Sequence, residues 1–520
     1  MTPTQARVLE HAAVSPRGDE RGAVGDPGRA PFRGLGQLGL GQLLGRDLAG
    51  TVAVVRRRWV SVLLGLSAIF AAVTALTTIH PAERLWGELA AVSNCVSAVI
   101  AAVAHRRGAT LAVLLSLAGA VLAPLAWMAS TRLGQPEVYV IIRSAKMLVH
   151  TGTPYASPAA LAAAHNWMAY DPYLPALIVF GVPRALGGGL LTDPRLWFGA
   201  AFVITFVAAL QVARVPRPGW WTVLVIASPV VALPLAVGGD DLPVLGLVCL
   251  GLALADRTVL ARGGDPPEPP DGQKASVTSS LRPWPPARRD DPLRPANGQW
   301  HWQWPVAAGL ALGLAAAMKA TAWPALAVAA ALLACRGGWR AIGWFSAAVA
   351  GVVLVTDGPV VAANPAATVA NTMLYPLGLT KVTSPAASQL PGHILASAGA
   401  WGHLAALALM AVAGAGVAAS LIIRPPADAQ AAGWRLVLGL TLLFGLAPAS
   451  RVGYFIYPLG LAAWLLLLRV KTGRSRDCAG RPEAAAEQPQ ELAEAAGQPR
   501  EPSADPVPAF GREAVTHIQD

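Results

Sequence analysis

The run WVSVLLGLSAIFAAVTALTT, residues 59–78, contains no charged side chain and directly follows three arginines at 56–58. A helix rises about 1.5 Å per residue, so a run of this length spans the roughly 30 Å hydrocarbon core of a bilayer. Similar apolar runs recur along most of the 520 residues. The sequence therefore predicts an all-α, polytopic integral membrane protein.

The composition excludes several other classes of protein. Charged residues make up 13% of the chain and hydrophobic residues 54%, whereas soluble domains carry about 25% charged residues. The apolar runs are also about twice as long as the roughly 10-residue strands of an outer-membrane barrel. The net charge is +11, but the arginines cluster at the ends of apolar runs. That pattern is typical of cytoplasmic anchoring, so we expect membrane lipid and no nucleic acid as a partner.

Three stretches lack sustained apolar character and are rich in Gly, Pro, Ala, Arg or Glu: residues 1–55, 262–303 and 471–520. Such compositions cannot bury enough apolar surface to offset the entropy lost on ordering. We predict that all three are disordered and cytoplasmic. The transmembrane domain is then expected at 56–470.

Thirteen apolar segments are candidate spans: 59–78, 87–104, 108–130, 173–189, 195–213, 219–237, 242–257, 305–318, 320–335, 341–356, 394–423, 434–449 and 453–470. The basic clusters between them all reach the cytoplasm only if one segment does not cross. The segment 173–189 is the weakest candidate span, because it is short and is interrupted by Pro175, Pro183 and Arg184. We therefore predict about twelve crossings of the cell membrane, with 173–189 re-entrant and both termini cytoplasmic.

This topology places four polar stretches on the external face: Thr131–Pro172, Gly238–Asp241, Asp357–His393 and Ser450–Tyr454, with Lys319 near them. Ionisable groups at membrane depth cost several kcal/mol and are usually functional. The convergence predicts a functional site at the outer surface.

The stretch EVYVIIRSAKMLVHTGTPY, residues 137–155, predicts an amphipathic helix in the outer loop. One face carries Val138, Ile141, Ile142, Ala145, Leu148 and Val149, and the other carries Tyr139, Arg143, Lys146 and His150. One interpretation is a helix that rests on the membrane with its cations against lipid phosphate. The other is catalytic, because Glu137 at the helix start is placed to remove a proton from a hydroxyl. Alternatively, Glu137 only favours the helix dipole.

The turn GGDD, residues 238–241, places Asp240 and Asp241 between two apolar runs. These carboxylates could accept hydrogen bonds from sugar hydroxyls, or the turn could be a plain interfacial one. Two aspartates without further nearby ligands fall short of a coordination set, so we predict no metal. Asp171, which precedes Pro172, could equally initiate a turn.

Two lone cations interrupt apolar sequence, Lys319 in AAMKATAWP and Arg451 in SRVGYFIYP. Either could stabilise the negative charge of a phosphate. Either could also snorkel from a helix end to the interface.

An ordered set of short motifs resembles a known family. It consists of Glu137-Val138-Tyr139, then GTPY at 152–155, then YDPYLP at 170–175. The chain is similar over residues 108–470 to polyprenol-phosphate-sugar-dependent glycosyltransferases of the GT-C class, especially glycosyltransferase family 87 and the mannosyltransferase of GPI-anchor synthesis. That family usually has aspartate where this chain has Glu137.

The resemblance implies an inverting hexosyltransferase that moves a sugar, mannose in particular, from a polyprenyl-phosphate donor to a lipid or glycan acceptor. It implies Glu137 as the general base and no further cofactor. The expected donor-phosphate residues are Arg143, Lys319 and Arg451, and the expected sugar or acceptor residues are Tyr139, Tyr155, Tyr170, Asp171, Asp240 and Asp241.

Two other classes remain open. A transporter or a flippase for lipid-linked sugars is also polytopic, although the sequence lacks the internal repeat that transporters often show. A catalytically inactive scaffold is the other alternative, because glutamate stands where the family usually has aspartate.

The topology makes a prediction for the loop that carries Glu137. A single cysteine replacing Ser157, in a chain otherwise free of cysteine, should react with an impermeant thiol reagent in intact cells. A cysteine replacing Ala485 in the C-terminal tail should react only after lysis. The reverse pattern would show that the loop faces the cytoplasm.

Overall fold

The computed structural model describes residues 58–104, 106–260, 302–382 and 384–479, and every regular element in these ranges is a helix. The chain divides into two units, Met1–Trp59 and Val60–Asp520, and the features below belong to the second. The segments 1–55 and 480–520 and most of 262–303, for which we predict disorder, lie outside the described residues. Helix α21 (Ile456–Ala479) extends past Lys471, where the C-terminal tail is expected to begin.

The first helices are α2 (Trp59–Thr77), α3 (Pro81–Val103) and α4 (Arg106–Leu117), and α4 continues through the π turn η1 (Ala118–Leu122) into α5 (Ala123–Thr131). Pro124 explains a contact in this group. Proline has no N–H, so the carbonyl of Ala120 lacks its usual donor four residues later. The fully buried Trp86 indole donates to that carbonyl at 2.8 Å.

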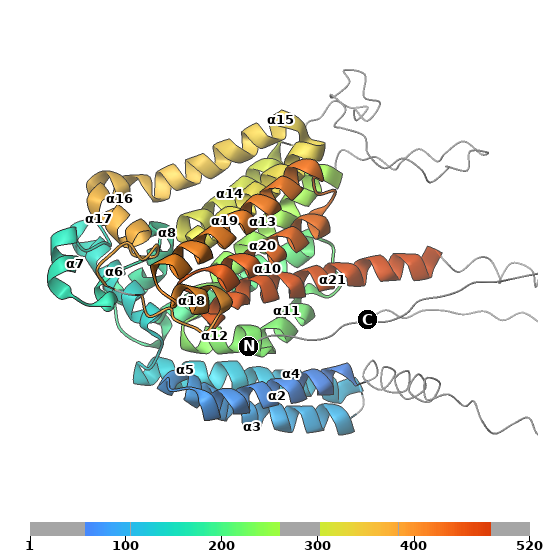
Figure 1. Ribbon diagram of the computed structural model, residues 1–520. Coiled ribbons are helices and arrows are strands. Elements are labelled where there is room, and N and C mark those ends of the chain that lie inside the picture. Colours follow the sequence, from blue (N-terminus) through green and yellow to red (C-terminus); the bar gives the residue numbers. More distant parts are fainter. Residues whose placement is uncertain (1–57, 105, 261–301, 383, 480–520) are drawn as a thin grey trace, which may run out of the picture. The chain divides into compact units, whose positions relative to one another are not determined.

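The remaining long helices are α10 (Pro194–Val212), α11 (Pro218–Ala227), α12 (Pro229–Val237), α13 (Leu242–Leu260), α14 (Gln303–Met318), α15 (Trp323–Thr356), α19 (Ala400–Ile423), α20 (Ala429–Leu446) and α21. Helix α13 packs against α10, α14, α15, α20 and α21 and so lies at the centre of this group (Figure 1). Its residues Leu242, Leu245 and Leu252 are fully buried. A helix apolar on all sides is expected in such a position.

Eight helices in the described ranges are long and apolar enough to cross a membrane, or nine if α11 and α12, bent by 68°, form one span. The predicted segment 394–423 divides into α18 (Pro391–Ala396) and α19. The segments 320–335 and 341–356 join in α15 across a kink at Gly338, whose φ of 66° favours glycine. The long helices alone therefore give fewer spans than the twelve predicted.

The segment 173–189 forms a broken apolar helix over Pro175–Leu186, made of α8 (Pro175–Ile178), η3 (Val179–Gly181) and α9 (Val182–Leu186). A helix of this length reaches only about 18 Å, which is too short to cross a bilayer. It packs against α6 (Pro136–Thr151), and a Cβ at Gly181 would lie 2.7 Å from the Ile141 carbonyl oxygen.

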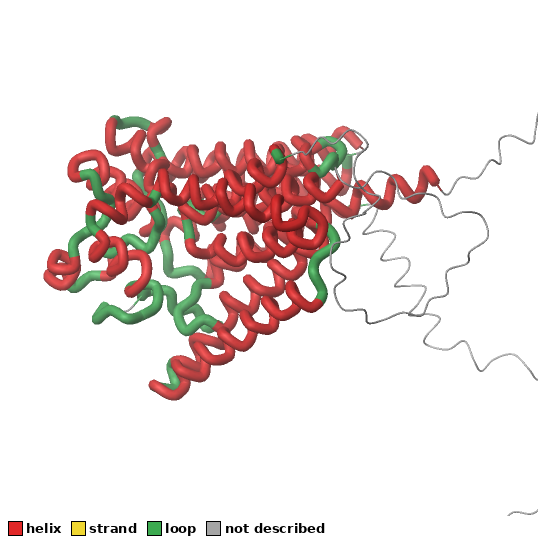
Figure 2. The backbone as a smooth tube through the Cα atoms, turned by 90° about the horizontal axis from the view of Figure 1, so that it is seen from above, coloured by secondary structure: helices red, strands yellow, loops and turns green. Residues whose placement is uncertain are grey.

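Short helices and loops gather at one end of the long helices (Figures 1 and 2). They include α6, α7 (Pro158–Ala164), η2 (Trp167–Ala169), η4 (Leu190–Thr192), η5 (Ala320–Ala322), α16 (Gly358–Ala363), α17 (Pro365–Val369), η6 (Ala370–Leu374), α18 and η7 (Val452–Phe455).

Backbone hydrogen bonds connect the polar stretches at this end. They join Gln135 N to Val237 O at 2.8 Å, Leu174 N to Met318 O at 3.1 Å and Ser388 N to Ser450 O at 3.0 Å. The first bond brings 131–172 to the residue before 238–241, and the third joins 357–393 to 450–454. The hydrogen bond from Asp171 N to Asn371 Oδ1 and the ion pair of Glu137 with Arg451 connect these two pairs of stretches, so all four lie at this end of the helices.

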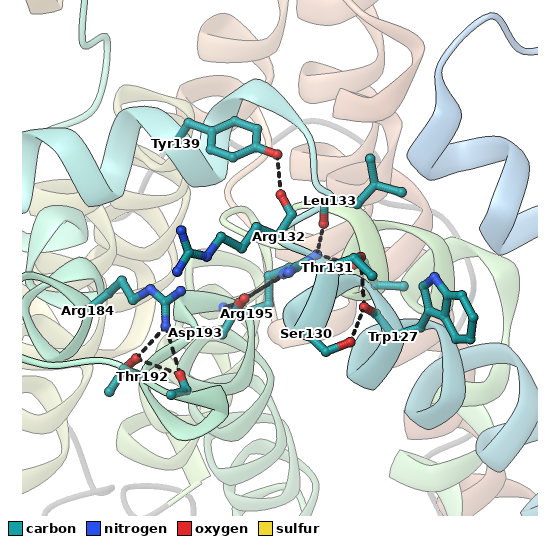
Figure 3. A network of polar contacts seen from close by, with 12 residues as sticks. Trp127, Ser130, Thr131, Arg132, Leu133, Tyr139, Arg184, Thr192, Asp193 and Arg195 are labelled. Atoms are coloured by element: carbon teal, nitrogen blue, oxygen red, sulfur yellow. Dashed lines mark hydrogen bonds and ion pairs between the residues drawn. The ribbon is translucent and has the colours of Figure 1, made fainter.

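A buried arginine, Arg195, ties two of these stretches together (Figure 3). Its side chain pairs with Asp193, with Nε at 2.9 Å from Oδ1 and Nη2 at 2.8 Å from Oδ2. Its Nη1 donates to the carbonyls of Leu133 and Ala236, each at 2.9 Å. Arg195 is only 1% exposed. Nothing in the sequence marks this arginine as buried. This network fixes the chain just before Glu137 against the chain just before the GGDD turn.

Replacing Arg195 with methionine should destabilise the protein by about 3–5 kcal/mol, because Asp193 would remain buried without its cation. Thermal unfolding of purified protein in detergent measures the effect. The matched control is Arg184→Met, since Arg184 donates to Gly189 O at 2.8 Å and Thr192 Oγ1 at 3.0 Å from a more open position. The control should cost about 1 kcal/mol or less. Equal losses for the two variants would contradict a special role for Arg195.

Candidate functional site

Glu137 and Arg451 form an ion pair between residues 314 positions apart in the chain. Glu137 lies in the first turn of α6, which Pro136 begins, and Arg451 directly precedes η7. The Glu137 side chain is 16% exposed and the Arg451 side chain 30%. Oε1 of Glu137 accepts from Arg451, while Oε2 is buried with no hydrogen-bond partner among the described residues. One carboxylate oxygen therefore remains able to accept a proton.

Lys319 lies between Asp240 and Asp241. Its Nζ is 2.8 Å from Asp240 Oδ2 and also pairs with Asp241 Oδ1. Lys319 is held at the break between α14 and η5, where its backbone is extended, and it is only 7% exposed. The ring of Tyr173 lies below the ammonium group, with its centroid 4.9 Å from Nζ. The cation is thus held by both carboxylates of the GGDD turn.

Two residues near this pair were missed at the sequence level. Tyr457 donates to Asp241 Oδ1 at 2.8 Å, and Thr321 donates to the Tyr457 hydroxyl at 3.1 Å. Thr321 follows Lys319 by two residues, and Tyr457 follows Arg451 by six. Both stretches were singled out only for their cations. An aromatic residue with a hydroxyl beside a lone cation was the available signal.

The Glu137–Arg451 pair and the group of Lys319 with Asp240 and Asp241 form one charge cluster of five residues. Burial raises the pKa of the Glu137 carboxyl above its ordinary value, Arg451 opposes this, and Asp240 raises it further. Glu137 therefore interacts electrostatically with both pairs. With all five groups ionised, three carboxylates and two cations give the cluster a net charge of −1.

A carboxyl with a raised pKa and a free oxygen, beside a partly exposed guanidinium, is suited to take a proton from a hydroxyl. The guanidinium is suited to bind a phosphate oxygen. Asp240 and Asp241 can accept hydrogen bonds from hydroxyl groups of a ligand. Within the described ranges, no three His, Cys, Asp or Glu side chains are grouped so that they could hold a metal ion.

Arg143 and Tyr139 lie outside the charge cluster, on the face of α6 that points away from it. Arg143 donates to the carbonyls of Met168 and Tyr170. Tyr139 is 41% exposed and its hydroxyl donates to Arg132 O at 2.6 Å (Figure 3). The structure thus brings Lys319 and Arg451 to the cluster but does not bring Arg143 there.

Tyr155 and Tyr170 make contacts that organise the loop. The buried Tyr155 donates to the carbonyl of Tyr173 at 2.7 Å. Tyr170 stacks on Tyr375, with ring centroids 4.4 Å apart. In the structure these rings support the segment that leads to Tyr173 and so act on the cluster indirectly.

Asp171 is buried at a turn that leads to Tyr173. Its N–H donates to Asn371 Oδ1 at 2.9 Å, and its own Oδ1 accepts from Tyr173 N at 3.0 Å. The second bond is that of a turn-initiating aspartate, the alternative raised by the Asp-Pro sequence. Burial raises the pKa of the Asp171 carboxyl to about 7, although the hydrogen bond from Tyr173 N and the charge of Arg143 oppose the change.

Comparison with known proteins finds no matching family model, no matching curated protein and no matching solved structure. The chemistry of the site therefore has to be argued from its own residues.

The raised pKa of Asp171 predicts a pH-dependent stability. The folded chain keeps the proton up to pH 7 or so, whereas the unfolded chain loses it near pH 3.8. This favours the folded state most below pH 4, and the advantage is lost as the pH rises toward 7. Asp171→Asn keeps the acceptor for Tyr173 but cannot ionise. Thermal unfolding from pH 4 to 8 should show the parent losing stability relative to this variant up to about pH 7 and no further. A constant difference across this range would contradict the assignment.

Proposed function

We propose that this chain is a membrane glycosyltransferase of GT-C type, which moves a hexose, mannose in particular, from a polyprenyl-phosphate donor to a lipid or glycan acceptor at the outer face of the cell membrane. The observation that carries the proposal is the charge cluster. A buried carboxylate with a free oxygen, a partly exposed arginine and a pair of aspartates meet where the helices end.

The proposed reaction is a single displacement with inversion. The acceptor oxygen forms a bond to the anomeric carbon while the bond from that carbon to the phosphate oxygen breaks. The bonding electrons leave with the phosphate, which gains one negative charge, and the acceptor proton passes to Oε2 of Glu137. Arg451 binds the phosphate oxygens, where a contact that strengthens as charge develops lowers the barrier.

The ion pair couples these two events. As Glu137 takes the proton, it becomes neutral and releases Arg451 from its carboxylate partner. The phosphate gains its charge in the same step. Arg451 therefore becomes available to the leaving phosphate as that phosphate gains its charge. The net charge of Glu137, Arg451, donor and acceptor together does not change.

Asp240 and Asp241 are the proposed sugar-binding carboxylates. Lys319 holds both of them at fixed positions, and Tyr457 orients Asp241. Lys319 is shared by two carboxylates, so its contribution to phosphate binding is weaker than that of Arg451. Its main part is to position the aspartates.

The packing supports the proposed twelve crossings. An even number places both termini on the same side of the membrane, and the basic clusters at the ends of the apolar runs favour the cytoplasm for that side. A Cβ at Gly309 would lie 2.5 Å from Phe345 O, and one at Gly313 would lie 3.0 Å from Val349 Cα. Both helices advance by four residues between these contacts, so α14 and the second half of α15 run in the same direction. The first half of α15 must then return, which makes three crossings. The eight long apolar helices and the bent pair of α11 and α12 give nine crossings. Helices α13, α14 and the first half of α15 add three, which makes twelve.

A transporter or flippase is the competing class. Transporter sites lie near the bilayer midplane, between helices that are broken there. Here Lys319 follows the last residue of α14, Asp240 and Asp241 precede α13, and Arg451 precedes η7 and α21. A cluster at helix ends fits chemistry at the membrane surface better than passage through the membrane.

The decisive assay incubates purified protein in lipid with radiolabelled polyprenyl-phosphate-mannose and cell-envelope acceptors. Glu137→Gln should lower transfer by about 10²- to 10⁴-fold, because general-base assistance is worth that much. Glu137→Asp should keep partial activity, since the carboxylate remains. The matched control is Glu88→Gln on the exposed surface of α3, which should transfer at the parental rate.

The same assay tests Arg451 and the rival base. Arg451→Ala should raise the donor concentration required and slow turnover together. Parental activity of Glu137→Gln together with loss of activity in Asp240→Asn or Asp241→Asn would move the base to the GGDD turn. Passage of labelled lipid across the bilayer without transfer to any acceptor would favour the flippase.

A further inference from the structure

The outer face of α6 lines an open groove of about 410 Å³. The side chains that decide its chemistry are Tyr139, Ile142, Arg143, Lys146, Met147 and His150. Sites for small ligands usually enclose about 300–1,000 Å³, so the groove is large enough for a headgroup but not for a whole lipid.

The groove is separate from the charge cluster. The opposite face of α6 is buried, with Ile141 and Ala145 packed into the protein core. Glu137 belongs to that side through its ion pair with Arg451. A ligand in the groove would therefore not contact the proposed base.

The groove is basic along its whole length. Arg143, Lys146 and His150 are spaced three and four residues apart, so they lie in a row on one helix face. The lining contains no carboxylate. No ion pair in the described part of the chain involves any of the three. Arg143 is oriented by the carbonyls of Met168 and Tyr170 and keeps its charge.

Apolar side chains accompany this row. Ile142 and Met147 line the groove beside Arg143 and Lys146, and Val149 on the same helix is 43% exposed. A basic row beside exposed apolar surface is complementary to an amphiphile with an anionic head.

We infer that this groove binds the phosphate-bearing headgroup of an anionic membrane phospholipid. The phosphate lies against Lys146 and His150 with Arg143 beside it, and the first part of the acyl chains follows Ile142 and Met147. Bound lipid holds α6 at the membrane surface, which fixes the depth at which its first turn, and with it Glu137, meets the membrane. The site does not depend on the proposed transfer reaction.

The test measures lipid retention by native mass spectrometry, with protein purified in detergent and mixed with equal amounts of phosphatidylglycerol and phosphatidylcholine. The parent should retain phosphatidylglycerol preferentially. The double variant Lys146→Gln/His150→Gln should lose that preference by about tenfold or more, which corresponds to the loss of 1.4 kcal/mol. The control Lys381→Gln/His80→Gln removes the same residue types from exposed positions elsewhere and should behave as the parent.

Three results would overturn the inference: equal retention of the two lipids by the parent, unchanged preference in the groove variant, or equal loss in the control. Displacement of the retained lipid by polyprenyl phosphate at an equal concentration would also overturn it, and would assign the groove to the donor. No sugar donor or acceptor is present in the main experiment, so its outcome is independent of whether the chain transfers sugar.

Discussion

The pairing of Lys319 with Asp240 and Asp241 is the constraint on which the rest of the structure depends. An unpaired ionised group buried inside a protein costs several kcal/mol, so these three charges are stable only together. They come from two helix ends that are distant in sequence, and their meeting requires both ends to lie on the same side of the helix bundle. Arg195 imposes a second requirement of this kind, because it is satisfied only if Leu133 and Ala236 are adjacent.

Apolar run length was sufficient to predict most helices, because in a bilayer every backbone polar group has to be satisfied within its own segment. Charge at the ends of the runs was sufficient to predict which polar stretches meet. The sequence could not show that 320–335 and 341–356 join across Gly338, since a glycine with positive φ leaves no mark in an apolar pattern. It also could not show Arg195 as a buried clamp, because the first turn of a span is where an anchoring arginine is equally expected.

Helix α6 shows where periodicity stops being informative. A period of 3.6 residues orders the side chains of α6 around its axis, but which side is covered depends on neighbours that are distant in sequence. Ile142 and Val149 were assigned to the apolar face, yet Ile142 lines the open groove and Val149 is largely exposed, whereas Ser144 is buried. The α8 to α9 segment covers the side that carries Ile141 and Ala145, and this leaves Arg143 on the other side, away from the charge cluster.

The charge balance of the cluster limits how a phosphate donor could be bound. With every group ionised, the cluster carries −1, and a phosphodiester brings another negative charge into the same buried region. Repulsion would oppose binding unless a proton entered with the donor. Burial raises the pKa of Glu137, and that of Asp171 to about 7, so these two carboxyls are the ones suited to hold such a proton. Under the proposed function, a proton on Glu137 would lower the negative charge of the cluster but would remove the base. Asp171 lies outside the cluster but interacts electrostatically with Asp240. Under the proposed function, a proton on Asp171 would therefore reduce the repulsion on the donor phosphate while Glu137 stays ionised.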